Sequence, residues 1–459
     1  MPASTLSKLQ TLHSQILPSC PAICKIPSRT FTNTTKAGTI SVNDFAALCR
    51  RKEENRMKRF IAFVVAVLSL CAMLAACGGS ASGSSASPST SSAAKPTAEP
   101  TPEPTPEPYE ANVLTGEKKD ENYPEGQRIT GIMINNIVAA RPQRGLSKAD
   151  ILVEIKVEGG ITRFMPMFVD YKDIGEFGPV RSGRDQFFQL LLPFAGLYVH
   201  EGQSVVMDEY ERNFKYQDLN IGNVGNWGYR DNNRVNWAGT TRAGGLAYEH
   251  TLYANSDLLQ EQIEKRGTDM NRSYNSTFFK FVDYNEPARD LSNSQDSAYS
   301  DKYGPIVSDG EYVEIEHSQS YKTRFNYDDA SNSYKMQMYY YPDKSWRDTI
   351  DEAADNAQLA FTNLVILYTD IHVYPGHEGT DLQCAEYGDG GVGYYCYGGK
   401  CEKIFWKKGG PQDALRLYYA NADGQCSDTQ LDVNVGKSYL TVVDVDSAEN
   451  FVHTSNSVG

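Results

Sequence analysis

The stretch GPVRSGRDQF, residues 178–187, places two arginines, a serine and an aspartate just ahead of an apolar run that is typical of a helix. Ser182, followed three residues later by Asp185, has the spacing of a capping box, in which the serine oxygen accepts a hydrogen bond from the first helical turn. Asp185 also suits the positive end of the helix dipole. These two residues predict a helix that starts here.

Arg181 and Arg184 exceed the needs of a helix start, because cations near a helix N-terminus are mildly unfavourable, by about 0.3 to 1 kcal/mol each. We therefore expect an anionic partner for both. One candidate is an internal carboxylate, of Asp150, Glu154 or Glu158. The other is an external anion held by helix N–H groups and guanidinium groups.

The second alternative predicts a polar groove in this half of the chain. It would hold an anionic or glycan-like ligand of the cell envelope, or the tail of a partner protein. Its expected lining consists of charged or hydrogen-bonding residues in and around the motif: Arg163, Arg181, Ser182, Arg184, His200, Glu154 and Glu158.

An enzymatic hypothesis uses some of the same residues. Ser182, His200 and a carboxylate are the parts of a nucleophilic triad. However, Ser182 does not lie in G-x-S-x-G, and a capping role would occupy its oxygen. Glu158, Glu201 and Glu249 are candidates for the paired carboxylates of glycoside hydrolysis. We favour binding over catalysis, with a wall-acting hydrolase that uses the same groove as the alternative.

The pattern gives little support for a metal site. The best cluster, HVYPGHE at residues 372–378, separates His372 and His377 by five positions and lacks the H-E-x-x-H order. The loop EYGDGGVG has too few carboxylates for a calcium site. We therefore predict neither a metal nor another cofactor.

Four cysteines lie in the last quarter of the chain: Cys384, Cys396, Cys401 and Cys426. In an exported protein this number suggests two disulfides. The sequence CYGGKC, residues 396–401, puts two glycines at a two-residue hairpin turn, so that its cysteines face each other across the strands. That pairing leaves Cys384 for Cys426. A zinc site is the rival interpretation, although the spacings lack a tight C-x-x-C.

Residues 57–77, MKRFIAFVVAVLSLCAMLAAC, have the basic start and apolar run of a secretory signal. Their end, LAAC, resembles the bacterial lipobox, in which the cysteine, here Cys77, becomes the N-terminus and carries lipid, palmitate included. The alternative is a short transmembrane anchor. Residues 1–56 precede a complete signal with its own Met57, so we expect a start codon assigned too early.

Residues 78–108 change from Ser/Gly/Ala to a Thr-Pro-Glu-Pro repeat and predict an extended tether. The expected location is the extracytoplasmic face of the bacterial cell membrane, with the lipid on Cys77 as the anchor. The formal net charge of −14 argues against nucleic acid as a partner. Partners expected besides the membrane are a cell-wall fragment or an envelope protein.

The rest of the chain predicts an α+β protein with two domains. Residues 109–290 interleave strands and helices, and the pattern predicts a hairpin formed by 151–157 and 162–171 within a mixed sheet with packed helices. Residues 291–459 contain short alternating runs that predict a mainly antiparallel, β-rich domain. The boundary lies in the polar, aperiodic segment 285–304.

Several long motifs resemble those of the YerB-like lipoprotein family. In the first half they are RPQRGLSKADILVEIKVEGGITRFMPMF, GPVRSGRDQF, YVHEG and EHTLY, and in the second YKTRFNYD, NLVILYTDIHV, GGVGYYCYGGKCEKIFWKK and GKSYLTVV. The resemblance covers nearly all of residues 110–445. It implies a secreted, membrane-anchored, two-domain α+β protein whose domains have no known function. The four cysteines and the Asn/Trp-rich segment near 220–240 are additions to the pattern.

Overall fold

The computed structural model describes residues 110–221, 227–230, 247–271, 278–293, 306–421 and 424–455. The predicted upstream extension, the signal with Cys77, the tether and most of the Asn/Trp-rich segment lie outside these residues. The described residues belong to one compact unit, Pro102–Gly459. None of the helices in these ranges has the length and hydrophobicity needed to span a bilayer.

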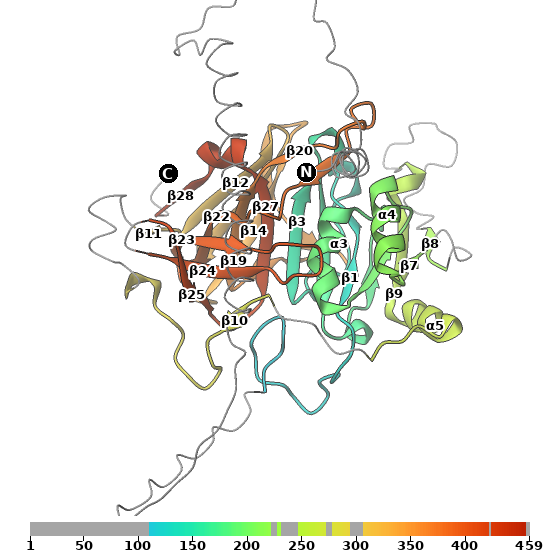
Figure 1. The fold of residues 1–459 in the computed structure, drawn as a ribbon, viewed down its shortest axis with the longest axis horizontal. Coiled ribbons are helices and arrows are strands. Elements are labelled where there is room, and N and C mark those ends of the chain that lie inside the picture. The colour runs from blue at the N-terminus through green and yellow to red at the C-terminus, as the bar shows by residue number, and fades with distance from the viewer. Residues whose placement is uncertain are drawn as a thin grey trace, which may run out of the picture. The chain divides into compact units, whose positions relative to one another are not determined.

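A thirteen-stranded mixed sheet forms the centre of the unit (Figure 1). Its main path follows the order β25 (Cys426–Gln430), β24 (Arg416–Ala420), β23 (Lys400–Lys407), β22 (Gly391–Tyr397), β19 (Asn363–Thr369), β27 (Ser438–Asp444), β3 (Ile151–Lys156), β4 (Thr162–Phe168), β1 (Thr130–Ile132), β6 (Leu197–His200) and β7 (Leu219–Asn220). Two strands pair off this path, β11 (Val307–Asp309) with β23 and β2 (Ile134–Asn135) with β4.

The two halves of the sequence meet inside this sheet. Strand β27 runs parallel to β3, with Leu440 opposite Val153, and also parallel to β19. Strands β3 and β4 form the predicted antiparallel hairpin. One sheet thus contains strands from both sides of residue 290, and the division into two domains at that point stays a proposal.

A second, six-stranded sheet comes from the C-terminal half. Its strands are β15 (Ser345–Asp348), β14 (Ser333–Tyr340), β13 (Tyr321–Asp328), β12 (Tyr312–Ser318), β28 (Val452–Thr454) and β18 (Ala360–Phe361). All of their pairings are antiparallel. The expected mixed sheet and the expected antiparallel region are therefore both present.

Two of the helices cover one face of the large sheet, and the second sheet covers the other. Helices α3 (Asp185–Leu191) and α4 (Val205–Phe214) lie side by side next to the cyan and green strands in Figure 1, whereas α5 (Ser256–Arg266) lies further out. Because side chains alternate across a strand, Val153 of β3 packs in the same core as Phe187 of α3. Its neighbour Leu152 packs with Phe325 of the second sheet. The large sheet is thus buried on both faces.

Short strands and turns complete the unit: β5 (Glu176–Phe177), β8 (Tyr229–Arg230), β9 (Leu252–Asn255), β10 (Lys280–Phe281), β16 (Ile350–Asp351), β17 (Ala357–Gln358), β20 (Ile371–Val373), β21 (Gln383–Ala385) and β26 (Asp432–Val433). Of these, β20 and β21 form an antiparallel hairpin. Strand β21 packs against α3, which brings a C-terminal hairpin next to the GPVRSGRDQF motif.

The predicted hairpin disulfide is confirmed. Cys396 and Cys401 are bonded and face each other across β22 and β23, with their Cα atoms 4.0 Å apart. Gly398 and Gly399 have φ angles of +59° and +71°, as a two-residue turn of this kind requires.

The second predicted disulfide is wrong, because Cys384 and Cys426 are both free. Cys384 lies in β21, which pairs with β20 in a separate two-stranded sheet, whereas Cys426 begins the edge strand β25 of the large sheet. Pairing by elimination failed because the two strands belong to different sheets.

Candidate functional site

The GPVRSGRDQF motif is bound along its backbone to strand β6 and its flanking loops. The N–H of Gly183 donates to the carbonyl of Gly202 at 2.9 Å, and the N–H of Glu201 donates to the carbonyl of Arg181 at 3.0 Å. A Cβ atom on Gly183 would lie 3.0 Å from the ring of Tyr198 and 3.2 Å from that of His200. Glycine therefore allows the motif to lie directly on β6.

The helix does not begin as predicted. Helix α3 starts at Asp185, and its N-cap residue is Arg184, whose side chain makes no capping hydrogen bond. The capping role of Ser182 is therefore wrong, because the helix starts too late for its side chain to reach the first turn. Asp185 is fully buried and accepts a 2.6 Å hydrogen bond from the hydroxyl of Tyr374. Burial raises the pKa of Asp185 to about 6.

Arg184 has an internal carboxylate as its partner, as one of the two alternatives predicted. Its Nε and Nη2 atoms donate to the two oxygens of Glu158 at 2.6 and 2.9 Å. This two-pronged arrangement is the strongest form of an arginine–carboxylate pair. Glu158 lies in the turn between β3 and β4, so the pair ties the start of α3 to that hairpin.

Arg163 of β4 lies beside this pair and is only 4% exposed. Its Nη1 donates to the carbonyl of Ser182, and its Nη2 lies 3.8 Å from Glu158. Its Nε is buried and has no hydrogen-bond partner in the described part of the chain. Burial and the charge of Arg184 lower the pKa of Arg163 to about 9, with Glu158 acting in the opposite direction and Arg181 contributing a smaller decrease.

Arg181 completes what we call the arginine cluster, Arg163, Arg181 and Arg184. Its Nη1 donates to the carbonyl of Glu249 at 2.9 Å, which connects the motif to the sequence EHTLY. Its charge lowers the pKa of Arg163 and, together with burial, that of His250. Arg163 and Arg184 therefore share the carboxylate of Glu158, and Arg181 lies close enough for its charge to act on Arg163.

Glu154 was expected in the groove, but it lies between the two sheets and is fully buried. Its oxygens accept hydrogen bonds from four side chains at 2.7 to 3.3 Å: Thr162, Asn136, Thr323 and Tyr439. The Nε2 of His317 is 3.5 Å away. Burial raises the pKa of Glu154, but His317 and the hydrogen bonds outweigh it and hold the value at about 2.

His200 was also expected to line the groove, but it is fully buried beneath Gly183. Its Nε2 lies 2.6 Å from Asp218 and its Nδ1 lies 2.8 Å from the carbonyl of Gly202. Burial lowers the pKa of His200, but hydrogen bonds to Asp218 and Glu211 raise it to about 9. Both ring nitrogens therefore carry protons at neutral pH, and His200 has no nitrogen with which to activate Ser182.

This buried imidazolium predicts a loss of stability at alkaline pH. Because the folded pKa of about 9 lies above the ordinary value of 6.5, the contribution is complete below pH 6.5 and is lost as the pH rises through 9. The free energy of unfolding should fall by about 2 kcal/mol between pH 7 and pH 9 from this group. Chemical denaturation of wild type and His200→Gln at both pH values measures the difference. An equal pH dependence in the two proteins would contradict it.

The sequence contains one sign of the network around Glu154. Strands β12 and β13 alternate buried and partly exposed positions, and the buried positions include His317 and Thr323 among apolar residues. A polar residue on the inward face of a strand needs a partner in the core. Asp218 and Glu211 had no comparable sign, because their contact with His200 depends on how the chain folds back after α4.

The mixed sheet, with helices on one face and a second, antiparallel sheet on the other, is built largely from two segments that each match a domain of unknown function. The Protein of unknown function (DUF3048) N-terminal domain matches residues 114–269, and the DUF3048 C-terminal domain matches residues 313–440. The chain belongs to the YerB-like family, as its motifs indicated.

Two comparisons with Bacillus subtilis proteins support this membership. The protein named "Putative lipoprotein YerB" from strain 168 is 31% identical over 180 residues, which are 39% of this chain. The match spans half the length of that relative. The crystal structure of the YerB protein has the same fold, with a TM-score of 0.55 and 21% identity over 73% of this chain and 98% of that one.

Proposed function

We propose that the protein is a lipoprotein anchored through Cys77 on the extracytoplasmic face of the membrane, and that its folded part binds an anionic ligand of the cell envelope. The lipobox-like end of residues 57–77 supports the anchor, as does the name of the Bacillus relative. The arginine cluster supports the binding role.

The observation that carries the binding proposal is the charge imbalance at the arginine cluster. Arg163 and Arg184 share the carboxylate of Glu158, the charge of Arg181 also acts on Arg163, and the buried Nε of Arg163 has no acceptor among the described residues. A buried donor without an acceptor costs about 1 to 3 kcal/mol. A ligand with a phosphate or carboxylate group would supply both the missing charge and the missing acceptor.

Arg181 is the member of the cluster that a ligand would meet first. The side chains of Arg163 and Arg184 are 5% and 12% exposed, and that of Glu158 is 21% exposed. Arg181 is partly exposed, and its hydrogen bond to Glu249 lies at the surface. Because guanidinium groups bind phosphate through paired, charge-assisted hydrogen bonds, phosphate-bearing fragments of the cell wall are the ligand class we propose.

Replacing Arg181 with glutamine should weaken binding of such fragments about ten-fold or more, because a charge-assisted hydrogen bond contributes about 1.5 to 3 kcal/mol. The measurement is a titration of full-length protein in detergent with purified wall fragments, followed by thermal melting. Arg347→Gln is the matched control, since Arg347 is an exposed arginine paired with Asp343 in the other sheet. Equal affinity of wild type and Arg181→Gln would refute the proposal.

The same incubation separates binding from the hydrolase alternative. A binding protein raises its melting temperature with the fragments and leaves them intact. A hydrolase releases muropeptides or sugars, which analysis of the recovered fragments detects. Product that appears with wild type and disappears with Arg181→Gln would replace the binding proposal with the hydrolase.

A further inference from the structure

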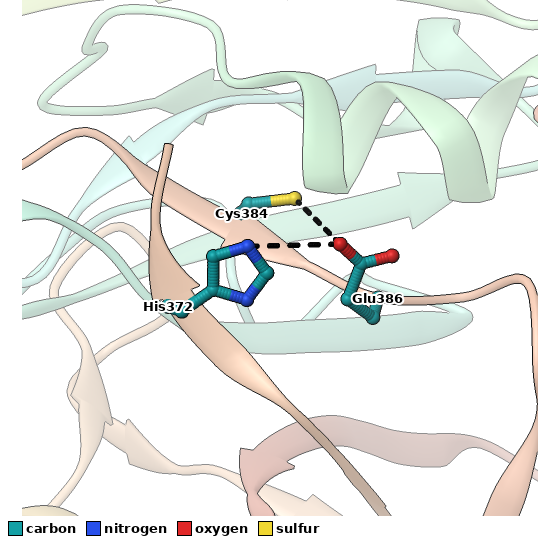
Figure 2. Close-up of side chains that lie close together, drawn as sticks. All are labelled: His372, Cys384 and Glu386. Carbon is teal, nitrogen blue, oxygen red and sulfur yellow. Dashed lines mark hydrogen bonds and ion pairs between the residues drawn. The ribbon is translucent and has the colours of Figure 1, made fainter. Parts of the chain in front are cut away.

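We propose that His372, Cys384 and Glu386 form a binding site for a divalent transition metal, with Zn²⁺ as the best chemical fit. The three residues lie on the hairpin of β20 and β21 and were not expected to bind metal. Figure 2 shows their side chains turned toward one another. Their potential ligand atoms all lie within 4.8 Å of one another.

The hairpin register places the three side chains on one face. His372 and Cys384 are direct partners across the two strands. Glu386 follows Cys384 by two positions, so it points to the same side. Its backbone extends the pairing, because its N–H donates to the carbonyl of Asp370 at 3.0 Å. The convergence therefore arises from the regular geometry of the hairpin.

The distances suit a tetrahedral metal site. A Glu386 oxygen lies 3.7 Å from the Cys384 sulfur and 3.6 Å from His372 Nε2. Ligand atoms around a tetrahedral zinc, at bond lengths of about 2.0 to 2.3 Å, are roughly 3.3 to 3.8 Å apart. Thiolate, imidazole and carboxylate are the ligands that zinc prefers. Three protein ligands leave a fourth position for water or a bound molecule.

His372 is oriented as a metal ligand would be. Its Nε2 faces the Glu386 oxygen, while its Nδ1 lies 3.3 Å from a carboxylate oxygen of Asp370, within ion-pair distance but without a hydrogen bond. Metal-binding histidines commonly direct their second nitrogen to a carboxylate, which fixes the ring and frees the first nitrogen for the metal. Asp370 is the positioning residue in this arrangement.

A second observation comes from the helix on the other side. Asp185 is fully buried, and its Oδ1 has no hydrogen-bond partner among the described residues. The hydroxyl of Tyr374 donates to its Oδ2 and also interacts with the Cys384 thiol. A buried carboxylate thus adds negative charge next to the thiol. A divalent cation would offset the combined negative charge of Asp185, Asp370 and Glu386.

Access and chemistry are both consistent with metal uptake. Cys384 is a free thiol and is 8% exposed, whereas the side chains of His372 and Glu386 are 37% and 54% exposed. An ion can therefore enter from the side of the histidine and the glutamate. When the sulfur–metal bond forms, the thiol proton passes to solvent, and no electrons are transferred.

A second group of potential ligands among the described residues, His200, Glu211 and Asp218, is less suitable. Both nitrogens of His200 already have acceptors at 2.6 and 2.8 Å, which include the carboxylate of Asp218. The imidazolium therefore already occupies the position that a cation would take. The group of His200, Glu211 and Asp218 therefore serves as an internal control for metal binding at the hairpin of β20 and β21.

Cobalt and zinc titrations of full-length protein in detergent test the site. We expect wild type to bind a single Co²⁺ with a thiolate-to-cobalt charge-transfer band, and Zn²⁺ to displace it. Cys384→Ser should remove that band and weaken Zn²⁺ binding at least about ten-fold. Cys426→Ser, which replaces the other free cysteine of the described residues, and His200→Gln should leave both unchanged. Absence of the band in reduced wild type, or equal Zn²⁺ affinity in Cys384→Ser, would overturn the proposal.

A second variant keeps the test independent of folding defects in the hairpin core. Asp370→Asn changes an exposed side chain that contacts His372 but is not a ligand. It should weaken Zn²⁺ binding about ten-fold and retain the cobalt–thiolate band. Unchanged Zn²⁺ affinity in Asp370→Asn would refute the assigned role of His372.

Discussion

Replacing Glu154 with alanine should lower the free energy of unfolding by about 3 to 5 kcal/mol, because it leaves the partners of a buried charge without their acceptor. Thr323, Tyr439 and Thr162 each donate to this carboxylate at 2.7 to 2.8 Å, and His317 lies 3.5 Å away. Chemical denaturation at neutral pH, followed by circular dichroism, measures the loss.

The control for this variant is Glu316→Ala. Glu316 lies on β12 in a more exposed ion pair with Lys322, and its removal should cost less than about 1 kcal/mol.

Acid denaturation provides a second test of the Glu154 network. The pKa of Glu154 is lowered to about 2 from the ordinary 4.5, so its contribution is present above pH 4.5 and is lost as the pH falls toward 2. A loss under 1 kcal/mol in Glu154→Ala would show that the network does not stabilise the fold.

Replacing Glu158 with glutamine should lower the free energy of unfolding by about 3 kcal/mol, because Arg163 and Arg184 lose the carboxylate that they share. Arg184 would lose both of its hydrogen bonds to a charged acceptor, and Arg163 would lose its nearest negative charge. The remaining guanidinium groups repel one another in a largely buried environment. Chemical denaturation in a buffer without phosphate or sulfate measures this effect.

Glu352→Gln is the matched control for Glu158→Gln. Glu352 accepts a 2.8 Å hydrogen bond from Arg144, and the two side chains are 30% and 16% exposed. It therefore belongs to a partly buried arginine pair outside the cluster, and its loss should cost clearly less. Similar losses in both variants would mean that the cluster carries no special excess of positive charge.

Local patterns in the sequence predicted much of the secondary structure but not how its strands combine. The runs ILVEIK and TRFMPMF predicted the β3–β4 hairpin, and CYGGKC predicted the disulfide-bonded turn, because each depends on neighbouring residues. The parallel pairing of β27 with β3 joins segments almost 300 positions apart. No local pattern specifies such a contact, so the shared sheet could not be predicted.

The candidate site was predicted only in part, because several of its contacts also join segments that are far apart in the sequence. The surplus charge of Arg184 indicated a partner, and Glu158 was among the three carboxylates named. The burial of Glu154 and His200 depends on which face of each strand packs against the next layer, and the sequence of a single strand does not specify this. The proximity of His372 and Cys384 requires the register of a hairpin whose connecting loop, residues 374–382, is too long for its Pro375-Gly376 turn signal to fix that register.

The most direct test of the binding proposal is calorimetric titration of inorganic phosphate into wild type, Arg181→Gln and Glu158→Gln under one set of conditions. The arginine cluster predicts an order of affinity in which Glu158→Gln binds phosphate most tightly, because phosphate replaces the missing carboxylate. Wild type should follow, and Arg181→Gln should bind most weakly. Equal affinities in the three proteins, or binding in none of them, would contradict an anion site at the arginine cluster.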